Sequence, residues 1–315
     1  MKPNAFNRSK FLSKAFPCSI TLALLAAMPV AQAANGTWTG GTSATWATTT
    51  NWSGGTVPGS TSANSDIATF NSATYSFQPT AAGSYFLGGL IFGSGNTNGI
   101  TITTGTGNGR MNIGSSGIQM NAGTGAVTLG TASTGLGINI VANQNWTNNS
   151  SSLLNINRVS VDDTLTGTYT ITINGSGSGG VTVNSNLNDD NTAASATRKA
   201  AVVINSAGSG ATNFANGSTY SGGTTLTAGL LQIGGASSGT VGAITSSCVG
   251  TGSLALNGGK ISSGSTSART ILNTLSIGGD IAIGDATNTG ALTFSGTIGL
   301  GGATRSLTTA SATEF

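Results

Sequence analysis

The sequence has no histidine, and only 6% of its 315 residues are charged. Without histidine the chain cannot build a histidine-based catalytic triad or a zinc site that uses imidazole ligands. Acid–base chemistry would depend on its eight aspartate and glutamate residues. These absences exclude most enzyme classes, so we expect no enzyme, no catalytic residues, no metal and no cofactor.

Proline and cysteine are also scarce, at five and two residues, whereas glycine is abundant, at fifty residues. Disordered chains are rich in proline and charge and poor in β-branched residues. Here threonine, isoleucine and valine occur throughout. The composition therefore indicates an all-β chain that is held by backbone hydrogen bonds and has small residues at its corners.

Residues 1–33 have the pattern of a signal peptide. An apolar run from Ile20 to Val30 precedes Ala31-Gln-Ala33, a small-x-small cleavage site before Ala34. The run is too short for a stable membrane span. A buried N-terminal helix is the alternative. The basic residues that come first are Lys2, Arg8, Lys10 and Lys14.

Removal of this segment changes the charge of the chain. It takes four of the eleven basic residues and leaves seven, against eight acidic residues. No basic stripe then remains to neutralise phosphates, so we expect no nucleic-acid partner. Cys248 becomes the sole cysteine, which excludes an intrachain disulfide and favours a buried thiol.

Residues 34–84 form a segment with three of the four tryptophans, Trp38, Trp46 and Trp52. The first coil of a solenoid has no neighbour on one side, and bulky rings can cover that end. We therefore expect a Trp-rich N-terminal cap. The alternative is a platform on which these rings stack against a glycan, which would make the chain a carbohydrate-binding surface module.

Short apolar-x-apolar triplets recur from about Tyr85 to the end of the chain at Phe315. Each triplet places two apolar side chains on one face of a strand and the middle side chain on the other. Glycine and asparagine between the triplets supply the corners. We predict a parallel β-helix (solenoid) over residues 85–315, with irregular coil spacing and with loops near Asn143–Ser152 and Asp189–Lys199. The triplets begin at Ile100, Ile118, Val127, Ile138, Ile171, Val181, Leu254, Leu275, Ile281 and Leu292.

One stretch is specific enough to indicate a family. It is a Gly-Gly corner followed by two short strand segments, and it resembles the autotransporter-associated β-strand repeat, also called the passenger-associated transport repeat. The matching residues are Tyr220, Ser221, Gly222, Gly223, Thr224, Thr225, Leu226, Ala228, Gly229, Leu230, Gln232, Ile233 and Gly234.

The resemblance implies a right-handed β-helical passenger that is secreted or displayed on the surface of a Gram-negative-type bacterium. Repeats of this family are thought to aid export and folding. The implied partner is an outer-membrane translocator, in cis or in trans, with a surface glycan or a host or matrix ligand as a further candidate. No barrel pattern of long alternating strands with aromatic girdles follows. We expect a truncated passenger, with a short secreted form that uses another protein for transport as the alternative.

The remaining candidates for chemistry are aspartates. Asp162-Asp163 and Asp189-Asp190 are adjacent pairs, and neighbouring side chains on a strand point to opposite faces. Asp189 and Asp190 with Arg198 and Lys199 resemble the acid-and-base sets of β-helix polysaccharide lyases, so a polysaccharide-active enzyme stays the lesser alternative to a solvated loop. The other two aspartates considered are Asp280 and Asp285.

Residues 186–191 also offer side-chain oxygens, the ligands that calcium prefers. The run lacks the spacing of an EF-hand and the Gly-Gly-x-Gly-x-Asp nonapeptide pattern. We therefore assign no metal site to it. The oxygen-bearing residues are Asn186, Asn188, Asp189, Asp190 and Asn191.

Overall fold

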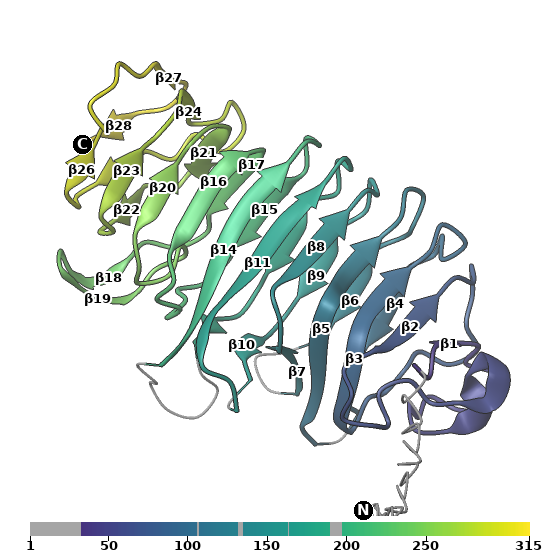
Figure 1. Cartoon of the computed structure of the whole chain (residues 1–315). Coiled ribbons are helices and arrows are strands. Elements are labelled where there is room, and N and C mark those ends of the chain that lie inside the picture. The colour runs from purple at the N-terminus through teal and green to yellow at the C-terminus, as the bar shows by residue number, and fades with distance from the viewer. Residues whose placement is uncertain (1–32, 106, 132–134, 163, 190–196) are drawn as a thin grey trace, which may run out of the picture. The chain divides into compact units, whose positions relative to one another are not determined.

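The computed structural model describes residues 33–105, 107–131, 135–162, 164–189 and 197–315. Within them the protein is all-β, with two short 3₁₀ turns, η1 (Thr49–Asn51) and η2 (Ser53–Gly55). Strands of successive turns pair in parallel and stack as a β-solenoid of about eight turns (Figure 1). The predicted parallel β-helix is confirmed. The predicted signal peptide lies outside the described residues, except for Ala33.

The largest parallel sheet carries two neighbouring faces of the solenoid. Its long strand β5 (Gly109–Met120) joins them, because its first half pairs with β7 (Leu136–Ile140) and its last three residues pair with β8 (Gln144–Asn148). The branch after β7 continues through β10 (Val159–Val161) and β13 (Leu187–Asn188). The main path also contains β1 (Gly36–Thr37), β2 (Asp66–Phe70), β3 (Gly83–Phe92), β11 (Gly167–Gly175), β14 (Arg198–Ser206), β16 (Thr224–Ala228), β20 (Leu254–Leu256), β23 (Leu275–Ile277) and β26 (Ile298–Gly299).

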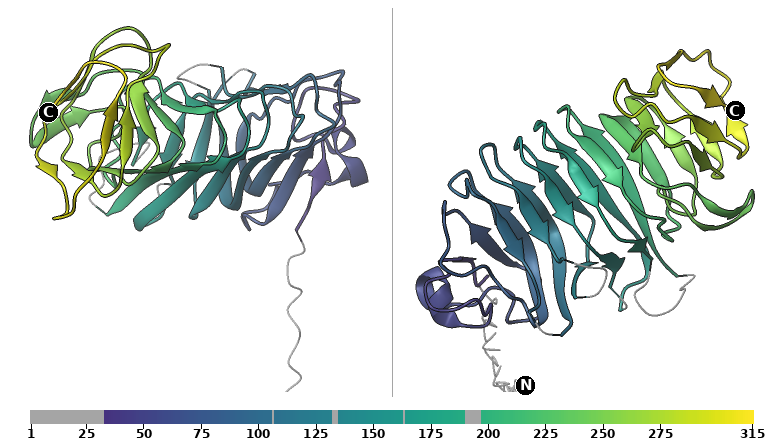
Figure 2. Two further views of the ribbon diagram at one scale, coloured as in Figure 1. Left: turned by 90° about the horizontal axis from the view of Figure 1, so that it is seen from above. Right: turned by 180° about the vertical axis from the view of Figure 1, so that it is seen from behind.

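A second parallel sheet forms the remaining face, opposite the first in the views of Figure 2. A smaller parallel sheet stacks the last turns. The second sheet contains β4 (Ile100–Ile102), β6 (Val127–Leu129), β9 (Leu154–Ile156), β12 (Val181–Val183), β15 (Ala211–Phe214), β17 (Leu230–Ile233), β21 (Lys260–Ser263), β24 (Ile281–Ile283) and β27 (Leu307–Thr309). The smaller sheet contains β22 (Arg269–Ile271), β25 (Leu292–Phe294) and β28 (Thr313–Glu314).

The ten predicted triplets all lie in strands. In β4, for example, Ile100 and Ile102 are buried and Thr101 between them is half-buried. The same alternation recurs in β6, β9 and β12, so each turn adds a layer of branched apolar side chains to the core. Parallel pairing in register places like side chains above one another, as Ile113 and Ile140 show.

The coil spacing is more regular than predicted in one part of the chain. In the second sheet Ile100, Val127, Leu154 and Val181 are aligned in register, each 27 residues after the one before. The prediction of irregular spacing is wrong for these turns. Farther on it holds: the steps from Val181 through Thr212, Leu231, Ile261 and Ile283 are 31, 19, 30 and 22 residues.

The predicted loop at Asn143–Ser152 is wrong in its centre, where strand β8 lies. Trp146 of β8 is fully buried, and its indole Nε1 donates a hydrogen bond to Oε1 of Gln144 at 3.0 Å. Gln144 in turn donates to the carbonyl of Ile113 on the preceding turn at 3.0 Å. Polar residues continue the strand here because their side chains find partners inside the solenoid.

The second predicted loop, Asp189–Lys199, lies largely outside the described residues, and Arg198 and Lys199 already belong to β14. An excursion that the sequence did not reveal is the antiparallel hairpin of β18 (Ser238–Thr240) and β19 (Ala243–Ser246). The hairpin projects from the side of the stack (Figure 1), and Val241 at its tip is exposed.

A short polar ladder runs through the core. Asn112, Asn139 and Ser160 occupy equivalent positions on three successive turns and are all nearly fully buried. Asn139 donates to Oδ1 of Asn112 at 3.1 Å, and Ser160 donates to Oδ1 of Asn139 at 3.0 Å. Stacked amides and hydroxyls satisfy one another, which stacked charges could not do.

The predicted Trp-rich cap is present at the N-terminal end. Trp46 is its centre, with ring centroids 4.6 Å from Trp52, 6.3 Å from Trp38 and 5.4 Å from Tyr85. Phe70 links the cluster to the next turn. Residues 34–84 also contribute strands β1 and β2 to the main sheet, so the cap is the first rung of the solenoid as well as its cover.

Candidate functional site

The family-like stretch from Tyr220 to Gly234 forms two sides of one turn. Strand β16 lies in the main sheet, strand β17 lies in the second sheet, and Gly229 makes the corner between them with φ of 92°. Leu226, Leu231 and Ile233 point into the core. The predicted Gly-Gly corner lies just before β16, where Gly223 has φ of 87°, and the two predicted short strands follow it; Gly229 is a second corner.

Tyr220 is the most deeply placed polar side chain of this stretch and is fully buried. Its hydroxyl donates to Oγ1 of Thr224 at 2.5 Å, and Thr224 donates onward to the carbonyl of Val249 at 2.9 Å. Burial raises the pKa of the Tyr220 phenol. The phenol therefore stays neutral and connects this turn to the next one, a structural role.

Glycine is required in this stretch by close approach to the preceding turn. A Cβ on Gly234 would lie 2.6 Å from the carbonyl oxygen of Phe214 and 2.7 Å from Cα of Ala215. Both atoms belong to backbone and cannot rotate away. The glycines of the motif thus set how closely two turns can stack.

Asp189 holds the start of the same stretch. Its Oδ1 accepts a hydrogen bond from the backbone N–H of Ala200 at 2.7 Å. Its Oδ2 accepts from the hydroxyl of Ser221 at 2.6 Å and from the Ser221 N–H at 3.0 Å. The carboxylate is occupied by these donors, which come from β14 and from the motif. Asp189 is therefore a staple between turns and not an open acid or base.

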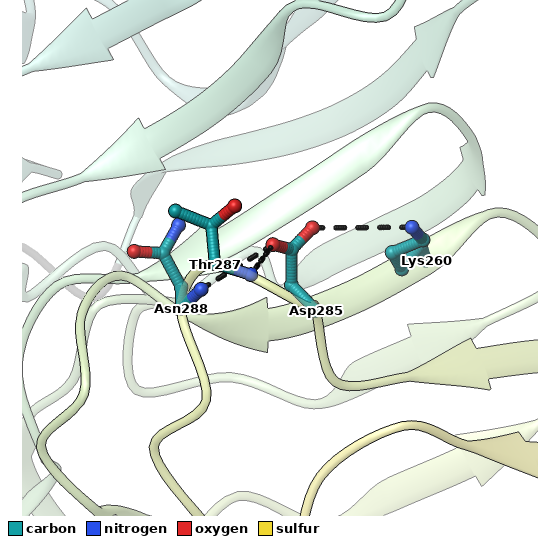
Figure 3. Close-up of polar contacts among 4 residues, drawn as sticks. All are labelled: Lys260, Asp285, Thr287 and Asn288. Atoms are coloured by element: carbon teal, nitrogen blue, oxygen red, sulfur yellow. Dashed lines mark hydrogen bonds and ion pairs between the residues drawn. The ribbon is translucent and has the colours of Figure 1, made fainter.

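Three further aspartates, Asp162, Asp280 and Asp285, cap local turns or bind the next turn. Asp162 accepts from the N–H and hydroxyl of Thr164 at 3.0 and 2.6 Å, and Asp280 accepts from the N–H of Ser306 at 2.9 Å. Asp285 accepts from the N–H of Thr287 at 2.8 Å, and its other oxygen lies 3.9 Å from Nζ of Lys260 (Figure 3).

The pKa of Asp285 lies below its usual value, chiefly because the Thr287 N–H stabilises the carboxylate, with the Asn288 N–H and Lys260 adding to it. This is a capped surface turn. Among the described residues no three histidine, cysteine, aspartate or glutamate side chains gather in a way that could hold a metal ion.

The proposed acid-and-base set of a lyase lies only partly within the described residues, where Arg198 and Lys199 begin β14. Asp190, Asn191 and Asp163 lie outside the described residues, and Asp189 is committed to Ser221. In the candidate calcium run, Asn188 also accepts a hydrogen bond, from the hydroxyl of Thr219 at 2.8 Å. Asn188 and Asp189 of the run thus bind the next turn.

The glycan-stacking alternative at the tryptophans does not fit the structure. Trp38, Trp46 and Trp52 are 1%, 0% and 3% exposed. Their indole N–H groups donate to the carbonyls of Phe77, Pro58 and Trp46. A sugar needs an open ring face, and these faces pack against each other and against the first turn, so the stacking interpretation is corrected to that of a closed cap.

Cys248 is buried, as expected, and burial raises the pKa of its thiol. Its Sγ accepts a hydrogen bond from the N–H of Gly235 at 2.9 Å. Because thiolate is the reactive form, a raised pKa makes this cysteine an inert part of the core.

A surface hollow of about 360 Å³ lies where the β18–β19 hairpin meets the turn beside it. Ile244 and Leu272 are its apolar lining residues, and the others carry hydroxyls or no side chain. It contains no titratable group, so it offers no means of acid–base catalysis.

Comparisons with protein-family models, with curated proteins and with solved structures find no match to this chain. In the described residues there is no helix long and apolar enough to cross a membrane.

The sequence pattern did not single out Asp66 as a functional residue. Asp66 begins strand β2 and is 1% exposed, although aspartate is rarely fully buried unless it has partners. The available signal was a lone acid at the start of the alternating run Asp66-Ile-Ala-Thr-Phe70, beside the tryptophans.

Proposed function

We propose that the protein is an exported β-helical passenger of the autotransporter-associated repeat type, displayed on the surface of a Gram-negative-type bacterium. Its role is structural or adhesive, and an outer-membrane translocator delivers it. The observation that carries the proposal is the Tyr220–Gly234 turn, whose corner, buried tyrosine and close glycine contacts use the residues on which the family resemblance rests.

The distribution of charge supports the same proposal. The described aspartates cap turns or tie neighbouring turns together through hydrogen bonds to backbone N–H and hydroxyl groups. Such a surface suits recognition or spacing better than catalysis. A solenoid held by parallel ladders can also fold turn by turn as it emerges from a pore, because each repeat contacts only its neighbours.

The test is to follow the native protein in the bacterium that encodes it. We expect intact cells to present the solenoid to an added protease, and we expect mass spectrometry to place the new N-terminus at Ala34. A cytoplasmic control protein must stay uncut in the same cells. Retention inside the cell with residues 1–33 still attached would refute the proposal.

The motif can be tested separately by replacing Gly234 with alanine and using Gly137→Ala as the matched control. A Cβ on Gly234 meets backbone at 2.6 Å, whereas a Cβ on Gly137 has 3.9 Å to its nearest neighbours. We expect the first variant to lower the amount displayed on the surface and the second to leave it unchanged. Equal display of the two variants would show that the motif turn has no part in delivery.

A further inference from the structure

The N-terminal edge of the solenoid contains a buried carboxylate that faces the start of the expected mature chain. Oδ1 of Asp66 accepts a hydrogen bond from the backbone nitrogen of Ala34 at 2.8 Å. Oδ2 accepts from the backbone N–H of Gly59 at 2.8 Å. The Asp66 side chain is thus fixed from two directions, with one oxygen aimed at Ala34.

The groups among the described residues that donate hydrogen bonds to this carboxylate carry no charge. Ser65 donates a long hydrogen bond to Oδ1 at 3.4 Å, and Leu87 is opposite Asp66 on β3. Tyr85, also on β3, is directed to the carbonyl of Ala82, and burial raises its pKa. The donors that the described residues supply to Asp66 are therefore all neutral, although a buried carboxylate is stabilised best by a cation.

The position of Ala34 in the sequence gives this contact a second meaning. The small-x-small pattern Ala31-Gln-Ala33 directs cleavage to the bond between Ala33 and Ala34. Hydrolysis of that bond by water leaves a carboxylate on the released leader and, after protonation, an α-ammonium on Ala34. The nitrogen that already faces Asp66 would then become the missing cation.

We propose that the cap binds the new α-ammonium of Ala34 through Asp66, so that leader removal completes the N-terminal end of the fold. The inference rests on leader cleavage after Ala33, which is part of the proposed function. The Asp66 carboxylate then distinguishes the precursor from the mature chain. In the precursor it accepts a hydrogen bond from the neutral amide of Ala34, and in the mature chain it forms an ion pair with the Ala34 α-ammonium, supported by the Gly59 N–H.

The pH dependence follows from the chemistry of the amine. An α-ammonium has an ordinary pKa of about 7.7–8.0, and a carboxylate beside it raises that pKa in the folded state. The added stability is therefore fully present below about pH 7.7 and is lost as the pH rises through the folded pKa. An increase of about one pKa unit corresponds to about a tenfold gain in the folding equilibrium constant.

The experiment compares four purified proteins released from a fusion partner by a protease in vitro. Two begin at Ala34 and two begin at Ala31, which moves the free amine three residues away and leaves residue 34 as a peptide amide. Each start is made with Asp66 and with Asp66→Asn. Urea unfolding is measured at pH 6.5 and pH 10.

We expect the folding equilibrium constant of the protein that begins at Ala34 to be about tenfold larger than that of the protein that begins at Ala31 at pH 6.5. At pH 10 the two constants should be equal. In the Asp66→Asn background the gap should be absent at both pH values. Equal stability of the two starts at pH 6.5 with Asp66 present would overturn the proposal.

A second measurement does not depend on the Asp66→Asn proteins being folded. The rate at which an amine-acylating reagent modifies the α-amino group of the Ala34 start is measured at pH 7.5. We expect it to be about tenfold slower than for the same protein unfolded in urea, because only the free amine reacts and the folded pKa is higher. Equal rates would count against the ion pair.

These outcomes are separable from those of the proposed function. The purified proteins are made without any export step, so a missing stability gap refutes only the ion pair. A cellular N-terminus that is not Ala34 refutes the leader assignment and leaves the Ala34–Asp66 chemistry as measured in vitro.

Discussion

The aromatic cap ends the stack of turns and the Tyr220–Gly234 turn continues it, and the two regions are stabilised by different kinds of residue. The cap uses the largest side chains in the protein, with Trp46 in contact with both other indoles and with Phe70. The Tyr220–Gly234 turn uses glycine corners and hydrogen bonds that reach the neighbouring turns.

The difference follows from what lies next to each region. Among the described residues the outer side of the first turn has no strand partner, so the stability of this end must come from apolar area removed from water. An inner turn has neighbours on both sides and gains ladder hydrogen bonds from each, so fit matters more than bulk. Removing side-chain volume should therefore destabilise the cap, whereas adding side-chain volume should destabilise the Tyr220–Gly234 turn.

The largest effect is expected from deleting the centre of the cap. Trp46→Ala should cost about 3–5 kcal/mol of unfolding free energy, since it leaves a cavity among buried rings. Chemical unfolding measures it. Phe77→Ala, at a ring that is 42% exposed, is the control and should cost less than about 0.5 kcal/mol. Similar losses for the two variants would mean that the cap adds little to stability.

The next effect is expected from adding volume to the Tyr220–Gly234 turn. Gly234→Ala forces a methyl group against the backbone of Phe214 and Ala215 and should cost about 1–3 kcal/mol. Gly137→Ala adds the same methyl group at a position where the nearest atoms would lie 3.9 Å from the new Cβ, and it should change stability by less than about 0.5 kcal/mol. A Gly234→Ala protein as stable as the wild type would show that the turns can move apart freely.

A smaller effect is expected from the hydrogen-bond chain of the turn. Tyr220→Phe removes the bond to Thr224, while Thr224 keeps its bond to Val249, so the loss should be about 1 kcal/mol. The matched control is Tyr169→Phe, whose hydroxyl donates to Thr166 in an exposed place. Thermal unfolding should show a larger loss of stability for Tyr220→Phe than for Tyr169→Phe, and a larger loss for Tyr169→Phe would refute the assigned role of Tyr220.

The smallest effect is expected outside both regions, at Asp285. Its pKa is lowered in the folded state, so its stabilisation is present above the ordinary pKa of about 3.9 and is lost as the pH falls through the lower folded value. Asp285→Asn should therefore cost less than about 1 kcal/mol at pH 7 and close to nothing at pH 2.

The same site separates the two causes of the shift. Lys260→Met should leave most of the pKa shift, measured by NMR titration, because the Thr287 N–H is its main cause and Lys260 is 45% exposed. Complete loss of the shift in Lys260→Met would assign it to the ion pair instead.

Much of the fold could be predicted from local pattern. Triplets such as Ile100-Thr-Ile102 have a period of two, and a half-buried strand needs little else to be recognised. The loop predicted around Trp146 failed because burial of Gln144 and its bond to Ile113 depend on a turn some thirty residues earlier. The hairpin at Ser238–Ser246 was missed because its apolar residues are few and its composition resembles that of the corners.

The candidate site was less predictable than the fold. The importance of Ser221 and Gly234 could be inferred as a motif, but the partner of Ser221 is Asp189, 32 residues away. Asp189 could be interpreted as a catalytic acid until its donors were known. The tryptophans illustrate the same limit, since an indole that stacks on a sugar and one that closes a cap are identical in sequence.

By itself the sequence determined the all-β character, the triplet strands, the absence of histidine chemistry and the small residues at the corners, because each depends on residue type and short spacing. The tertiary structure alone decided which residues face one another across turns: the 27-residue register, the Asp189–Ser221 staple, the closed tryptophan cap and the Ala34–Asp66 contact. Stacking of the turns creates the register, the staple and the Ala34–Asp66 contact from residues far apart in the sequence, and the folded first turn brings the three tryptophans together. The chemistry of each residue changes with the neighbour that it acquires.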